Sequence, residues 1–182
     1  MSSYCIYLEL EPYLKQWFIH DMGNEHPVSL IRNSAESDIV RRWLTVLPPE
    51  MAMPDGNPDM LAIYIPSYNE LDREKLYYLP TAALKLLKEC IRNRFVIQMW
   101  RDLSDFGFIG FQKQDVIYAW MEQHGIEPTE MNWNAIAKRY QRKRRAYFNA
   151  ILQKNKRLQR KKVTESSASA SSSSSPQSDS ED

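Results

Sequence analysis

The sequence predicts an α+β protein, with a small N-terminal sheet of about three strands and a helix, followed by a mostly helical C-terminal half. That half should end in a long basic helix and a disordered tail. Three observations lead to this prediction. Short β-forming runs separated by turn residues fill the first 80 residues, and apolar residues recur every three to four positions after Thr81. The third is that Lys and Arg gather near the C-terminus.

The same patterns divide the chain into three expected parts. Residues 1–80 form an α+β unit, 81–163 a helical module with an αα-hairpin and the basic helix, and 164–182 a disordered acidic tail. The tail is mostly serine, so it has no apolar side chains with which to form a core.

Bulk composition favours a folded protein in a reducing compartment. Apolar residues make up 43% of the 182 residues, more than disordered chains carry. Cys5 and Cys90 lie far apart and form no CxxC motif. No apolar run approaches the roughly 18 residues that cross a bilayer, and the N-terminus does not resemble a secretory signal. We expect a cytoplasmic protein without membrane contact, nucleoid-associated if bacterial and nuclear if eukaryotic.

Three segments of the first part are rich in strand-forming side chains, namely residues 4–10, 28–31 and 60–65. Pro12 should end or border the first strand, because proline has no N–H to donate to a ladder. Between the second and third segments, Asn33 precedes Glu36 by three residues, which is a capping signal. It predicts a helix with one apolar face, formed by Ile39, Val40, Trp43 and Leu44.

Helical periodicity takes over in the second part. Leu84, Leu87, Ile91 and Phe95 predict one long helix, or two helices broken near Asn93. The next apolar stripe predicts a helix over 116–124, ended by Gly125 in a left-handed conformation. The last helix should then begin near Trp133, with Asn132 or Thr129 as its N-cap.

Charge is strongly segregated along the chain. Residues 138–162 contain twelve Lys and Arg and no Asp or Glu, whereas residues 1–137 contain 12 Lys and Arg against 19 Asp and Glu. The body thus carries about −7 and the basic segment +12. A helix with so concentrated a positive charge is typical of proteins that meet a polyanion, because each phosphate contact releases counterions.

On a helical projection, most of these cations lie opposite the apolar residues of the last helix. We expect this face to bind nucleic acid, with DNA as the favoured class, mainly through phosphate contacts. Asn and Gln side chains on the face could also reach base edges. The predicted contact residues are Lys138, Arg139, Arg142, Lys143, Arg145, Asn149, Gln153, Lys156, Arg157 and Arg160.

Residues 116–148 resemble the Myb/SANT-like helical DNA-binding pattern. The resemblance rests on Trp120, on His124-Gly125 and on a W-x-x-I-A element that starts at Trp133, and it covers under a fifth of the chain. It implies DNA binding by a helix-turn-helix-like module. In that family a short turn and a separate recognition helix follow, whereas residues 141–145 here contain no Gly or Pro. The whole chain is more loosely similar to small accessory proteins of bacterial phages and mobile elements.

Two other functions remain open at this stage. The protein could be an interaction adaptor whose basic helix binds acidic proteins, with a partner or a second copy bound by the acidic N-terminal half. It could also be a metal-dependent nuclease that holds Mg²⁺ through Glu9 and Glu11 or through Glu36 and Asp38. The histidines do not have metal-site spacing and no phosphate-binding loop is present. We therefore expect a non-enzymatic protein with no catalytic residues, metal or cofactor.

Overall fold

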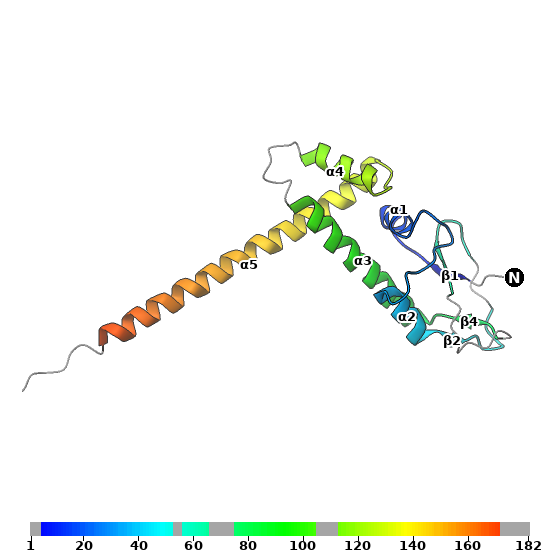
Figure 1. Ribbon diagram of the computed structural model, residues 1–182, viewed down its shortest axis with the longest axis horizontal. Coiled ribbons are helices and arrows are strands. Elements are labelled where there is room, and N and C mark those ends of the chain that lie inside the picture. Colours follow the sequence, from blue (N-terminus) through cyan, green and yellow to red (C-terminus); the bar gives the residue numbers. More distant parts are fainter. Residues whose placement is uncertain (1–4, 53–55, 66–74, 105–112, 172–182) are drawn as a thin grey trace, which may run out of the picture. The chain divides into compact units, whose positions relative to one another are not determined.

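A computed structural model describes residues 5–52, 56–65, 75–104 and 113–171, and these form an α+β fold with a mostly helical C-terminal half, which confirms the predicted class (Figure 1). The described strands are β1 (Cys5–Leu8), β2 (Thr45–Val46), β3 (Leu61–Tyr64) and β4 (Tyr77–Tyr78). The described helices are α1 (Pro12–Asp21), α2 (Ala35–Trp43), α3 (Thr81–Ser104), α4 (Lys113–Gln123) and α5 (Glu130–Ser171).

The chain divides into two compact units, and the division lies after Tyr140. The first unit, residues 1–140, contains every strand described above, helices α1 to α4 and the start of α5. The second unit begins at Gln141. This division differs from the boundaries expected at residues 80 and 163, and α3 shares one apolar core with α1, α2, β1 and β3.

Phe95 of α3 lies at the centre of that core. Its ring makes edge-on contacts with Tyr13 and Trp17 of α1 and with Trp120 of α4, at centroid distances of 5.3, 5.2 and 5.7 Å. Edge-on aromatic pairs of this kind add to the free energy gained by burying their area. Helix α3 runs unbroken through Asn93 and buries one residue in four, namely Ala83, Leu87, Ile91, Phe95, Met99 and Leu103.

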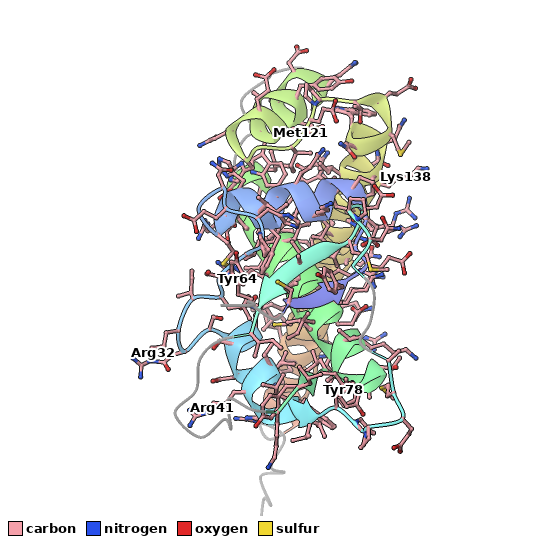
Figure 2. The ribbon with its side chains drawn as sticks, turned by 90° about the vertical axis from the view of Figure 1, so that its right-hand side faces the viewer. Arg32, Arg41, Tyr64, Tyr78, Met121 and Lys138 are labelled. Atoms are coloured by element: carbon pink, nitrogen blue, oxygen red, sulfur yellow. The ribbon has the colours of Figure 1, made fainter. Side chains whose placement is uncertain are left out.

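The strands form two separate antiparallel ladders. In Figure 2, the label Tyr64 lies at the end of β3 in the first ladder, and the label Tyr78 at the end of β4 in the second. Strand β1 pairs with β3, from Cys5 opposite Tyr64 to Leu8 opposite Leu61. The predicted strand at 28–31 is only a parallel bridge between Val28 and Ile63, in which the Val28 N–H donates to the Ala62 carbonyl at 2.8 Å. The second ladder, β2 with β4, was not predicted, since two-residue strands leave no periodic signal in a sequence.

Helix α1 is a further element, which follows the predicted strand at 4–10 and was not itself predicted. Pro12 occupies its first turn. Backbone N–H groups in a first turn have no acceptor within the helix, so the lack of an N–H in proline costs nothing there, and its fixed φ angle suits a helix. The helix buries Tyr13, Leu14, Trp17 and Phe18. Pro12 therefore does border the first strand, and it also begins the next helix.

Helix α2 confirms the predicted helix but corrects its cap and its face. Ser34, not Asn33, is the N-cap, and its hydroxyl accepts a hydrogen bond from the Ser37 N–H at 3.1 Å. Val40 is fully buried, whereas Trp43 at the end of the helix is 44% exposed. The apolar face is therefore narrower than the sequence predicted.

The turn between α4 and α5 follows the predicted chemistry closely. Gly125 adopts a φ of +66°, and a Cβ there would lie 2.7 Å from the ring of His20. Thr129 caps α5, since its hydroxyl accepts from the Asn132 N–H at 3.3 Å. Asn132, which is buried, donates to the side chain of Gln16 on α1. These hydrogen bonds fix the first turn of α5 against α1.

Helix α5 is longer than predicted at both ends. It begins at Glu130 and continues to Ser171, eight residues into the predicted disordered tail. No Gly or Pro interrupts the sequence between these residues, so nothing in the chain stops the helix earlier. The rest of the predicted tail, 172–182, lies outside the described residues.

The central position of Phe95 predicts the outcome of a paired substitution in α3. Phe95→Ala should lower the free energy of unfolding by about 3–4 kcal/mol, because it removes a ring that contacts three other aromatic side chains. Ile97→Ala, two residues away but 65% exposed, should cost less than about 0.5 kcal/mol. Urea denaturation followed by tryptophan fluorescence measures both, and similar losses for the two variants would contradict the described core.

Candidate nucleic-acid interface

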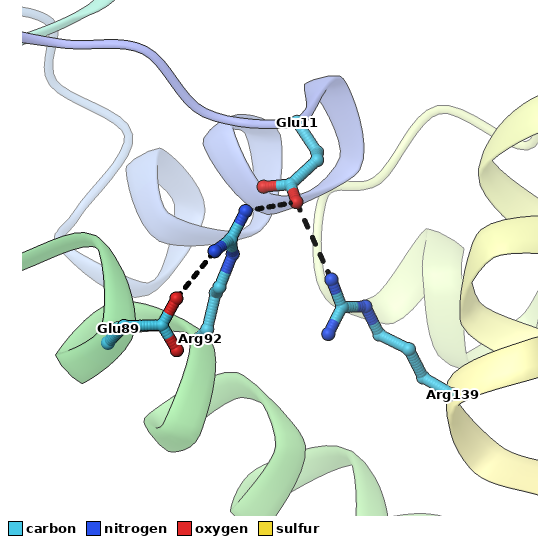
Figure 3. Close-up of polar contacts among 4 residues, drawn as sticks. All are labelled: Glu11, Glu89, Arg92 and Arg139. Atoms are coloured by element: carbon cyan, nitrogen blue, oxygen red, sulfur yellow. Dashed lines mark hydrogen bonds and ion pairs between the residues drawn. The ribbon is translucent and has the colours of Figure 1, made fainter. Parts of the chain in front are cut away.

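Glu11, directly before α1, ties the beginning of the basic helix to the core of the first unit (Figure 3). One of its carboxylate oxygens lies 2.6 Å from an Arg92 guanidinium nitrogen on α3 and 3.5 Å from Arg139 on α5. Arg92 also pairs with Glu89 at 2.6 Å. A single carboxylate thus links three helices that are far apart in sequence.

The surroundings of Glu11 shift its acidity. Burial raises the pKa of this carboxyl, but the hydrogen bond from Arg92 and the positive charges of Arg92 and Arg139 outweigh that effect. The net result is a pKa below the usual value of 4.5. Glu11 therefore remains ionised at neutral pH and stabilises the folded first unit through its two arginines.

Arg139 was predicted to contact nucleic acid, but the structure engages it inside the first unit. Besides its ion pair with Glu11, its guanidinium carbon lies 5.6 Å from the centroid of the Tyr13 ring. Its side chain is 30% exposed. Lys138, the neighbouring predicted contact, is exposed and points away from the core in Figure 2.

A second polar cluster joins α3 to α4 beside the start of α5. Asp102 accepts a hydrogen bond from the Trp120 indole at 3.1 Å and lies 3.4 Å from the His124 Nε2 atom. The other ring nitrogen of His124 lies 2.8 Å from the Trp120 carbonyl, so His124 caps the end of α4. Tyr140 donates to the Leu103 carbonyl at 3.4 Å. Together with Glu11, these contacts fix α5 up to the end of the first unit.

Residues 141–162 of α5, here called the basic segment, belong to the second unit. Every side chain in this segment is exposed, and none is a carboxylate. Ten of its 22 residues are cations, and at about 1.5 Å per residue it is roughly 33 Å long. The ten are Arg142, Lys143, Arg144, Arg145, Lys154, Lys156, Arg157, Arg160, Lys161 and Lys162.

Successive residues of this helix are separated by about 100°, which gives the basic segment two distinct sides. Its polar face consists of Arg142, Arg145, Asn149, Gln153, Lys156, Arg157 and Arg160. All seven were predicted as contact residues, and the helix brings them together on one side. Lys143, the remaining predicted contact of this segment, lies at the edge of the opposite side.

The contact prediction omitted some of the exposed side chains in the basic segment. Four of these are the cations Arg144, Lys154, Lys161 and Lys162, which the helical projection places off the polar face. Five more form an apolar stripe of Tyr147, Phe148, Ile151, Leu152 and Leu158. Their spacing is visible in the sequence, but their exposure is not, because the same spacing usually marks a buried face. The Glu11 cluster has no sequence signal, since 81 residues separate Glu11 from Arg92.

One member of each acidic pair considered for metal binding is engaged with an arginine in the first unit. Glu11 pairs with Arg92, and the buried Glu36 lies 3.5 Å from Arg94. Within the described residues, no group of three or more His, Cys, Asp or Glu side chains is placed to hold a metal ion. Burial raises the pKa of the Cys5 thiol, and burial with the negative charge of Glu36 raises that of Cys90, which disfavours thiolate chemistry at either. None of the described helices has the length and apolarity to cross a bilayer.

Glu11→Gln removes the charge at the centre of the arginine cluster and should lower the free energy of unfolding at neutral pH by about 1 kcal/mol, allowing for partial solvent screening. Because folding lowers the pKa of Glu11, its contribution is present above pH 4.5 and is lost as the pH falls through the folded-state value. The difference between the variant and the wild type should therefore shrink below about pH 4.

Chemical denaturation at several pH values tests this, with Glu9→Gln as the control, since it makes the same charge change at an exposed side chain. The control should change the free energy of unfolding by less than about 0.5 kcal/mol at each pH. A Glu11→Gln effect of constant size down to pH 2 would show that the carboxylate charge is not what stabilises the cluster.

No protein-family model matches this chain, and comparisons with curated proteins and with solved structures found no match either. What the protein does must then follow from its own chemistry. The most unusual part of that chemistry is the exposed, carboxylate-free basic segment.

Proposed function

We propose that the protein binds nucleic acid, with DNA as the favoured class, through the basic segment of α5. One observation carries this proposal: ten exposed cations and no carboxylate lie within 22 consecutive residues of one helix. The role that follows is that of an accessory or regulatory protein in a DNA-based process. It would act in the cytoplasm at the nucleoid of a bacterium, or in the nucleus of a eukaryote.

Electrostatics support this proposal over a merely hydrated helix. Exposed helices usually mix acidic and basic residues, because pairs of opposite charge three or four residues apart stabilise the helix. In the basic segment the neighbouring charges repel one another instead. Association with a polyanion relieves that repulsion and releases condensed counterions from the phosphates, so binding is favoured even without base recognition.

The polar face is composed to track a phosphate backbone. Its five cations can each contact a phosphate, while Asn149 and Gln153 can donate hydrogen bonds to phosphates or base edges. Helix α5 continues without a break from Glu130 through residue 148, so the separate third helix of the Myb/SANT-like pattern has no counterpart there. This favours phosphate contacts over sequence-specific recognition in the major groove.

The charge of the rest of the chain also favours a contact restricted to the basic segment. Residues 1–137 carry 12 Lys and Arg against 19 Asp and Glu, so the first unit repels a phosphate backbone as a whole. Arg139 is engaged by Glu11 and Tyr13. The contact set that we propose is accordingly Arg142, Lys143, Arg145, Asn149, Gln153, Lys156, Arg157 and Arg160.

The direct experiment is fluorescence anisotropy with the full chain and labelled duplex DNA, single-stranded DNA and RNA, between about 50 and 300 mM salt. Binding should weaken steeply with salt, and the tightest of the three ligands identifies the class of nucleic acid. Absence of binding to all three at low salt would overturn the proposed function.

Arg142→Ala with Arg145→Ala should weaken binding to every duplex by a similar factor and reduce the salt slope by about two, since each arginine accounts for roughly one phosphate contact. The matched control is Arg32→Ala with Arg42→Ala, two exposed arginines of the first unit, which should leave the slope unchanged. An unchanged slope in the first variant would remove both arginines from the contact set, and a reduced slope in the control would place the binding surface on the first unit.

A further inference from the structure

The proposed nucleic-acid contact leaves one side of the basic segment unexplained, namely the apolar stripe. Its five side chains, Tyr147, Phe148, Ile151, Leu152 and Leu158, are between 36% and 57% exposed. Single exposed apolar residues are ordinary, but here five lie on one side of the helix over three turns, with Asn155 among them. The ring of Phe148 also lies beside Tyr147 and under the Arg144 guanidinium, at 5.9 and 5.6 Å.

Cations border this stripe along both edges. On a projection of about 100° per residue, Lys143, Lys154 and Lys161 lie along one edge, and Arg145 and Lys156 lie along the other. Arg144 and Lys162 lie in line with the stripe, beyond its two ends. An apolar stripe surrounded by charges has the pattern by which helices recognise one another. The apolar residues supply affinity, and the edge charges select the partner.

We propose that the apolar stripe docks an amphipathic helix of a different protein, one whose own apolar stripe is flanked by Asp and Glu. Charge complementarity is the reason for this choice. The partner's carboxylates would lie opposite the lysines and arginines at the edges of the stripe. Its apolar side chains would cover Ile151, Leu152 and Leu158, which a phosphate backbone cannot do.

A second copy of this chain is a poorer occupant of the same surface. Residues 138–162 contain no Asp or Glu, so pairing of two basic segments in either direction would place cations opposite cations. Like charges across a helix pair oppose association. The acidic partner removes this repulsion and covers the same apolar area.

The proposal goes beyond nucleic-acid binding and does not depend on it. The centre of the polar face, at Arg142, Asn149, Gln153 and Arg160, lies opposite the apolar stripe, whereas Lys143, Arg145 and Lys156 lie between the two surfaces and border both. One helix could thus hold a phosphate backbone and a partner helix together. Each contact can be disrupted by substitutions that leave the other side chains in place.

The probe is a labelled synthetic helix about four heptads long, with Leu at the a and d positions and Glu at e and g. Its binding to the full chain is measured by fluorescence anisotropy at about 150 mM salt. Two further peptides serve as comparisons. One replaces Glu by Lys, and the other keeps Glu but replaces Leu by Ser.

Ile151→Gln with Leu158→Gln should weaken binding of the Leu/Glu peptide by at least about tenfold, because it removes two apolar contacts and leaves every charge in place. The matched control, Ala146→Gln with Ala150→Gln, introduces the same side chains outside the stripe and should change binding by less than about twofold. Circular dichroism verifies that both variants keep the helix content of the wild type. The Lys and Ser peptides should bind at least about tenfold more weakly than the Leu/Glu peptide.

Several results would overturn this proposal. Equal binding of the Ser and Leu peptides would mean that charge alone attracts them, and equal binding to the stripe variant and the wild type would mean that the stripe is not the docking surface. Failure of the Leu/Glu peptide to bind would also overturn the proposal.

A further outcome concerns a second copy of this chain. If sedimentation showed a wild-type dimer that Ile151→Gln with Leu158→Gln converts to a monomer, the occupant of the stripe would be that second copy. Duplex binding measured on the same variants separates these outcomes from the proposed function, since loss of the stripe should leave DNA affinity within about twofold.

Discussion

The contact on which the first unit most depends is the packing of Phe95 against aromatic rings from two other helices. Tyr13 and Trp17 lie on α1, and Trp120 lies on α4, so this ring joins segments that are more than 100 residues apart. The four-residue spacing of buried positions along α3 extends this contact in both directions. Strands β1 and β3 add buried side chains to this same core, which reaches from the first 80 residues into α3, α4 and α5.

Electrostatics act differently in the two units. In the first unit, opposite charges meet at short range, as at Glu11 and Arg92, and the lowered pKa of Glu11 corresponds to a contribution to stability. In the second unit, the described basic segment has one sign of charge only and complete exposure. The first arrangement serves folding. The second costs folding free energy through repulsion and is therefore better understood as a surface for partners.

The sequence predicted the features that local chemistry determines. The period of α3, the left-handed Gly125, the Thr129 cap and the polar face of α5 all follow from residue types at fixed short spacings. It did not predict α1, the β2–β4 ladder or the Glu11–Arg92 pair, because these depend on contacts across long stretches of chain or on elements too short to show a period. For the same reason Arg139 could not be separated from the other cations of α5 before its carboxylate partner was known.

The continuity of α5 has a consequence for how the basic segment becomes helical at all. Starting a helix in water is costly, since several residues must be ordered before the first hydrogen bond forms, whereas extending an existing helix is nearly free. The first turns of α5 are ordered by hydrogen bonds of Thr129, Asn132 and Tyr140 within the first unit. The repelling cations downstream therefore need only to propagate a helix that has already been nucleated. Folding of the first unit thus sets the helicity of a segment that could not readily start a helix by itself.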